Sequence, residues 1–143
     1  MRIFVLLGIG CLLLTNAITA QAPESFQPVG TMSELMVSMV YPAANEILLF
    51  IYRGAPKDDK EWVALQHSAV RLAESGNVLM MRGHALNQGD WIKDAKMLVD
   101  VGAAAYKAAR DKDANALAAL NEPLNAACTT CHKQYRPNVH PRP

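Results

Sequence analysis

Three side chains near the C-terminus have the types and the spacing that cofactor chemistry requires. Cys128-Thr129-Thr130-Cys131-His132 is a C-x-x-C-H sequence. Two thiols three positions apart project from the same side of one helical turn, where they can add to two vinyl groups of one haem. The histidine that follows can then reach the iron from one face. The pattern is typical of c-type haem attachment. It predicts one covalent haem c held by Cys128 and Cys131, with His132 as an axial iron ligand.

The same five residues have three other interpretations. A redox-active C-x-x-C pair belongs to a βαβ context, whereas this chain is predicted to be helical. A structural zinc site usually takes four cysteine or histidine ligands, and the remaining histidines, His67, His84 and His140, are single and scattered. A plain disulfide would leave His132 unexplained. Haem is therefore the favoured cofactor, and thiol redox chemistry and zinc binding remain as alternatives.

The first 20 residues predict an export signal that does not belong to the fold. Arg2 gives a positive start, residues 3–14 are an apolar run, and residues 15–20 are small and mildly polar. That order is typical of a secretory signal peptide. The run is shorter than the roughly 20 residues that span a membrane, so an uncleaved anchor is the less favoured alternative. We expect cleavage after Ala20, one mature domain over 21–143 and a periplasmic location.

The charge and composition of the mature chain exclude several classes of function. Without Arg2, thirteen basic residues balance thirteen acidic ones, and no basic stripe suggests binding to nucleic acid. No Ser/His/Asp pattern, paired carboxylates in an apolar setting or glycine-rich phosphate loop is present. We therefore expect a protein that is not an enzyme.

The elements that must position the motif are predicted to be four helices. Apolar residues recur three and four positions apart over about 32–53, 58–83, 90–110 and 113–136. Helices of this length with short connections predict an all-α, antiparallel four-helix bundle. Asp58 and Glu61 predict a capping box at the second helix. Pro42 and Pro123 lie inside helical patterns, so we expect a kink or a restart at each.

The order of these features resembles the class II cytochromes c, which comprise the cytochrome c′ group and its low-spin relatives. An export signal is followed by four helices, and C-T-T-C-H-K-Q-Y-R stands on the last. The resemblance covers the whole mature chain in architecture and is strongest from Cys128 to Arg136. It implies a haem between the last helix and the first. Some relatives dimerise through their first two helices, so a homodimer is a candidate state.

Arg136 matches the end of the family motif and is a candidate contact of a haem propionate. It also has a plain structural interpretation, because a cation at a helix C-terminus complements the helix dipole. Trp62 and Trp91 each open a helix, and we expect them to pack at the ends of the bundle. His84 follows Gly83 in a predicted loop, and we expect it to be a surface histidine.

The second axial position of the iron decides the predicted function. Low-spin members of the family take a methionine from the first helix, and this chain offers Met32, Met36 and Met39 there. Their spacings of four and three predict one common face aimed at the core, although methionine is also a common gap-filler. We favour Met36, which lies about one turn into the helix and before the Pro42 kink, and keep Met32 and Met39 as alternatives.

The two states of that position imply different roles. His/Met ligation raises the reduction potential of a haem, and it predicts a single-electron carrier that meets redox partner proteins. An empty position would leave five-coordinate iron that binds NO or CO, as in a cytochrome c′. Electron transfer is the favoured function, and gas binding is the alternative.

Overall fold

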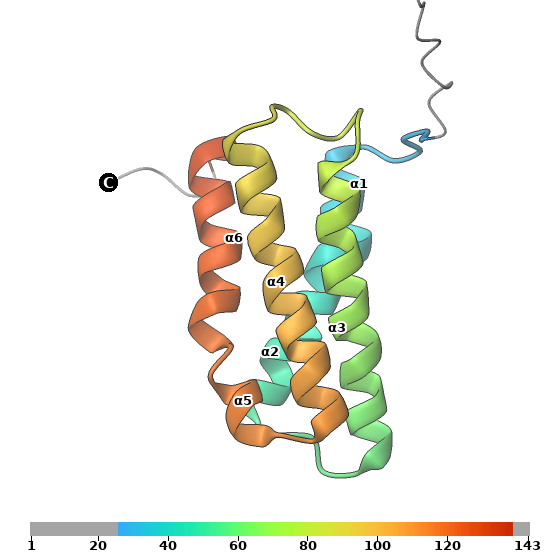
Figure 1. The fold of residues 1–143 in the computed structure, drawn as a ribbon, viewed down its shortest axis with the longest axis vertical. Helices are drawn as coiled ribbons and strands as arrows, with labels where there is room; N and C mark the ends of the chain where they lie inside the picture. Colours follow the sequence, from blue (N-terminus) through green and yellow to red (C-terminus); the bar gives the residue numbers. More distant parts are fainter. Residues whose placement is uncertain (1–25, 139–143) are drawn as a thin grey trace, which may run out of the picture.

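The computed structural model describes residues 26–138, which form an all-helical bundle without strands in that range (Figure 1). The helical segments are α1 (Met32–Leu35), η1 (Met36–Val40), α2 (Tyr41–Tyr52), α3 (Asp59–Met80), α4 (Asp90–Asp111), α5 (Ala114–Ala118) and α6 (Asn121–Tyr135). α1, η1 and α2 are continuous, and α5 precedes α6 after a short turn, so the segments make four rods. The predicted all-α bundle is confirmed. The predicted export signal and His140 lie outside the described residues.

The first rod begins at a capping box and remains helical through Pro42. Thr31 Oγ1 accepts a hydrogen bond from Glu34 N–H at 3.3 Å, and the Glu34 carboxylate accepts one from Thr31 N–H at 2.7 Å. A π turn follows over Met36–Val40, in which the Tyr41 N–H donates to the carbonyl five residues earlier. Proline crowds the carbonyl four residues before it, and a wider turn relieves that crowding. A π turn thus replaces the kink or restart expected at Pro42.

The second rod starts at Asp58, as predicted, but with half of the expected capping box. The Asp58 carboxylate accepts a hydrogen bond from Glu61 N–H at 2.8 Å. The Glu61 carboxylate accepts one from Lys57 N–H at 2.8 Å and pairs with Arg53 at 2.9 Å. Glu61 therefore ties the start of α3 to the end of the first rod.

Glycines stand at the contact between α3 and α4. This pair has the most extensive interface in the described chain. A Cβ on Gly102 would lie 2.6 Å from the backbone N of Ala73, and one on Gly76 would lie 2.6 Å from Val99 Cγ2. Protein interiors are close-packed, so neither position accepts a side chain without movement of its neighbours.

The fourth rod is interrupted before Pro123, which confirms the restart expected there. The Asp113 carboxylate caps α5 by accepting a hydrogen bond from Ala116 N–H at 2.9 Å. A turn at 119–120 separates α5 from α6. Pro123 then falls in the first turn of α6, where backbone N–H groups have no partner within the helix. The restart leaves α6 uninterrupted from there through residues 128–132.

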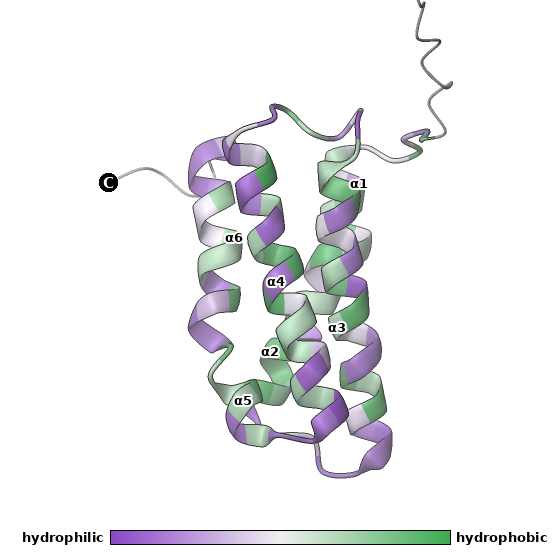
Figure 2. Cartoon of the chain, in the orientation of Figure 1, coloured by the Kyte–Doolittle hydropathy of each residue, from purple (hydrophilic) through white to green (hydrophobic). Residues whose placement is uncertain are grey.

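The core is uneven, since the first rod and the last scarcely touch. The large side chains that are fully buried are Ile47, Leu65, Leu72, Leu117 and Leu124. α2 packs on α3 and α4 packs on α6, whereas the contact between α2 and α6 is sparse. Figure 2 shows apolar residues along all four rods and hydrophilic residues gathered at the loops at the lower end. The first rod and α6 instead line a common space.

The first rod is also the most apolar helix of the described chain. Over Met32–Tyr52 it is long and apolar enough to cross a membrane by length and composition, a test that core helices of bundles also pass. One side buries Ala43 and Ile47 in the bundle, whereas Val37 and Tyr41 are each 67% exposed. That second side faces the space toward α6.

Candidate functional site

α6 presents the motif side chains to the interior of the bundle. Leu124 and Ala127 are buried and hold the helix against its neighbours. Cys128, Cys131 and His132 are half-buried, and all three line one cavity. The sequence analysis expected both thiols to project from one side of a helical turn with the histidine close by, and the described geometry has this arrangement.

Two adjoining cavities open between the first rod, α4 and α6. The larger has a volume of about 440 Å³ and the smaller about 300 Å³. Both volumes fall in the size range of ligand sites, about 300–1,000 Å³. The residues that line both are Met36, Trp91, Cys131, His132 and Arg136. The first rod supplies apolar side chains to the larger cavity, namely Val37, Val40, Tyr41, Ala44 and Leu48. The exposed side of the first rod is thus a cavity wall.

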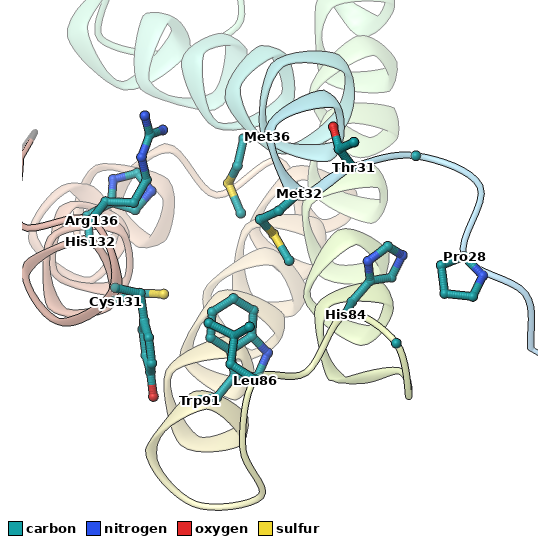
Figure 3. Close-up of a pocket in the computed structure, with 13 residues that line it drawn as sticks. Pro28, Thr31, Met32, Met36, His84, Leu86, Trp91, Cys131, His132 and Arg136 are labelled. Carbon is teal, nitrogen blue, oxygen red and sulfur yellow. The ribbon is translucent and has the colours of Figure 1, made fainter.

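Two of the three candidate methionines reach this space, and the third does not. Met36 lines both cavities and Met32 lines the smaller one. Figure 3 shows both side chains extending toward the space that His132 and Cys131 face from α6. Met39 instead lines a separate, small space beside α3. The π turn explains the separation, because a wider turn rotates the residues after Met36 away from the common face that a regular α-helix would keep.

His84 is buried, so the expectation of a surface histidine is wrong. It is 8% exposed and lines the smaller cavity, on the side away from α6 (Figure 3). The loop turns inward at Gly83, which has a φ of +95° and lies so close to Pro28 that a Cβ would be 2.4 Å from Pro28 Cγ. Helical periodicity could not indicate this, because the contact comes from the segment before the first rod.

Trp91 and Tyr135 close the end of the site, and Trp91 combines the expected end packing with a place in both cavity walls. Its indole N–H donates to Leu79 O at 2.7 Å. Its ring meets Tyr135 edge to face, with centroids 4.8 Å apart. The Tyr135 hydroxyl accepts a hydrogen bond from Asn87 Nδ2 at 2.9 Å. Arg136, at the C-cap of α6, is exposed, and its backbone N–H donates to the backbone carbonyl of His132 at 2.8 Å.

Asp94 is a site residue that the sequence analysis missed. It is 4% exposed, lines the larger cavity, and its Oδ2 has no hydrogen-bond partner. Burial raises the pKa of this carboxyl, as does the nearby charge of Asp90, while Lys93 opposes the shift. A signal was available in the sequence, because Asp94 stands three residues after Trp91 and four before Leu98. That spacing puts a lone acid on the apolar stripe of the helix.

Burial also raises the pKa of both thiols. For Cys131 the value rises to about 11, first through burial and then through the neighbouring Asp94 and Cys128. For Cys128 burial is the cause. A redox-active or nucleophilic cysteine has a lowered pKa. The site therefore holds two neutral thiols at neutral pH, which is unlike the environment of a thiol redox pair.

The donor set of the site consists of two thiols, an imidazole and thioether sulfurs around an apolar space. Within residues 26–138, no three His, Cys, Asp or Glu side chains converge in a way that could hold a metal ion by themselves. Comparisons with protein-family models, with curated proteins and with solved structures find no match to this chain.

Proposed function

We propose that this chain is an exported, monohaem c-type cytochrome that carries single electrons between redox partner proteins. In this proposal Cys128 and Cys131 hold haem c covalently and His132 is an axial ligand. One observation carries it: the C-x-x-C-H segment of α6 lines an apolar cavity whose far wall holds the sulfur-bearing side chain of Met36. A disulfide or a zinc site would need no such cavity.

The residues around the cavity fit a haem in chemistry and in size. Both thiols face the larger cavity, where they would hold the two vinyl groups of one haem. The wall supplied by the first rod is apolar except for Asn45, and Val37 and Tyr41 are exposed in it, so a flat hydrophobic group would cover them. When bound, haem supplies an iron that alternates between the ferric and ferrous states.

The protein's own residues would control that iron in three ways. His132 would hold it from α6, and Met36 would hold it from the first rod, with Met32 as the alternative sulfur. His/Met ligation raises the reduction potential and leaves no open position for a gas. The apolar walls would exclude water, which lowers the local dielectric and strengthens the effect of nearby charges. Arg136 lines both cavities at an exposed position and would complement a propionate.

The test is to produce the full chain, with its own leader, in cells that have a cytochrome c maturation system. We expect a mass increase of one haem that survives denaturation, an N-terminus at Gln21 and a periplasmic location. Cys128→Ala/Cys131→Ala should lose the covalent haem. A chain that gains no haem under these conditions contradicts the proposal.

Absorption spectra then separate electron transfer from gas binding. A low-spin spectrum with a far-red sulfur-to-iron band, unchanged by CO, supports the electron carrier. A high-spin ferrous spectrum that shifts at once with CO or NO supports the alternative, a five-coordinate gas-binding protein. The haem itself would be established in either case.

A further inference from the structure

Asp94 is the one carboxylate among the described residues that lines either cavity. Two polar side chains of α6 that line the same cavity are engaged within their own helix: Thr129 Oγ1 donates to Asn125 O at 2.9 Å, and Asn125 Nδ2 donates to Asn121 O at 3.0 Å. Asp94 Oδ2 is buried without a partner. A buried polar group without a partner destabilises the folded state, and an apolar residue on the same stripe would avoid that loss. A buried carboxyl without a partner therefore calls for an explanation other than the stability of the fold.

Asp94 lies close to Cys131, one of the two proposed haem-attachment residues, and few charged side chains surround it. The charge of Asp94 contributes to the raised pKa of Cys131 on α6, which places the Asp94 carboxyl near the second attachment point. On α4 itself, Asp90 and Lys93 act on it with opposite signs. The titratable or charged groups that face the same cavity from the other helices are Tyr41 on α2 and Cys128, Cys131, His132 and Arg136 at α6.

We propose that Asp94 takes up a proton when the haem iron is reduced and releases it when the iron is oxidised. This inference rests on the proposed function. Ferric iron carries one more positive charge than ferrous iron, and a nearby positive charge favours the ionised carboxylate. On reduction the partner protein supplies the electron to iron and solvent supplies the proton to the Asp94 carboxylate. Both transfers reverse on oxidation, so the charge of the buried site stays constant.

The consequence is a reduction potential that depends on pH. Between the pKa of Asp94 in the ferric protein and its higher pKa in the ferrous protein, the potential falls as pH rises. One proton per electron gives at most about 59 mV per pH unit, the one-electron equivalent of a tenfold change. Above this range the carboxylate stabilises ferric iron, so its removal raises the potential. Below this pH range, Asp94 is neutral in the ferric and in the ferrous protein, so removal of its carboxyl changes the potential little.

The experiment is a spectroelectrochemical titration of the haem-loaded full chain from about pH 5 to pH 9. It compares the wild type with Asp94→Asn, and uses Asp100→Asn as the matched control, because Asp100 lies on the same helix but is exposed and paired with Lys96 at 2.6 Å. We expect a flatter slope and a higher potential above neutral pH in Asp94→Asn alone. Any slope that remains in this variant belongs to other groups, such as the propionates.

A second measurement needs no variant. Redox-difference infrared spectra of the wild type should gain the carbonyl band of a protonated carboxylic acid on reduction. Equal pH slopes in wild type and Asp94→Asn, or the absence of that band where Asp94→Asn does not fold, overturn the inference and leave the cytochrome proposal intact. A chain without covalent haem overturns both.

Discussion

Trp91 and Tyr135 meet edge to face, with ring centroids 4.8 Å apart and ring planes at 74°. The contact joins the first turn of α4 to the last turn of α6. The Trp91 N–H is held by Leu79 O and the Tyr135 hydroxyl by Asn87. The pair thus links four segments, namely α3, the loop before α4, α4 and α6, around the end of the cavity that His132 lines.

Replacing Tyr135 should loosen this end of the bundle. Tyr135→Leu removes the aromatic pair and should lower the free energy of unfolding by about 0.5–1.5 kcal/mol beyond the loss of buried area. Tyr135→Phe keeps the ring and should lose less. Denaturant unfolding of the two variants measures the difference. Tyr106→Leu, at a more exposed position on α4, is the control, and an equal loss there would remove the special role of Tyr135.

The sixth-ligand assignment predicts distinct effects for two methionines three residues apart. In the haem-loaded protein, Met36→Ala should abolish the far-red sulfur-to-iron band and allow CO to bind, because the iron then lacks the Met36 sulfur as its sixth ligand. Met39→Ala should preserve the spectrum, since Met39 lines the separate space beside α3. Spectra with and without CO make the comparison. If Met32→Ala changes the spectrum and Met36→Ala does not, Met32 is the ligand.

The raised pKa values of the thiols predict slow alkylation of the haem-free protein. At pH 8 an ordinary thiol, with a pKa near 8.5, is partly ionised, so the lower thiolate fraction of Cys131, with a pKa of about 11, should slow its reaction about 200-fold. Iodoacetamide kinetics followed by mass, with circular dichroism to verify helicity, measure the rate. Asp94→Asn should accelerate Cys131, because the carboxylate contributes to its raised pKa. Equal rates in the folded and guanidinium-unfolded chain would contradict this.

The same shift makes the haem-free fold less stable in alkali. The folded state binds the Cys131 proton more tightly than the unfolded state does. The associated stability is therefore complete below the ordinary thiol pKa and is lost as pH rises toward about 11. Cys131→Ser should weaken this part of the dependence, as measured by denaturant unfolding at several pH values.

Gly102 should not tolerate even a methyl group. Gly102→Ala would set a Cβ against the backbone and side chain of Ala73, both within 3 Å, and overpacking of this kind costs about 1–3 kcal/mol. The higher helix propensity of alanine offsets up to about 1 kcal/mol of that loss. Ala103→Leu, at an exposed neighbouring position, should change the free energy of unfolding little. A Gly102→Ala variant as stable as the wild type would show that α3 and α4 can separate at no cost.

Local patterns were sufficient for the helices and for the motif. Apolar spacing indicated all four rods, and the position of Pro123 indicated the break before α6, because both depend on residues a few positions apart. Pro42 shows where such reasoning ends: a proline in a helix predicts disruption, but a π turn absorbs it, and that turn separates Met39 from Met36.

The sequence by itself determined that Cys128, Cys131 and His132 lie on one side of a helix, since three- and four-residue spacing is a property of the helix itself. Only the tertiary structure decided what they face. The sparse contact between α2 and α6 leaves room for the cavity, Pro28 packs against Gly83 in the loop that carries His84, and the packing of α4 buries Asp94 without a partner. Each of these depends on segments far apart in the chain, and no local period encodes their meeting.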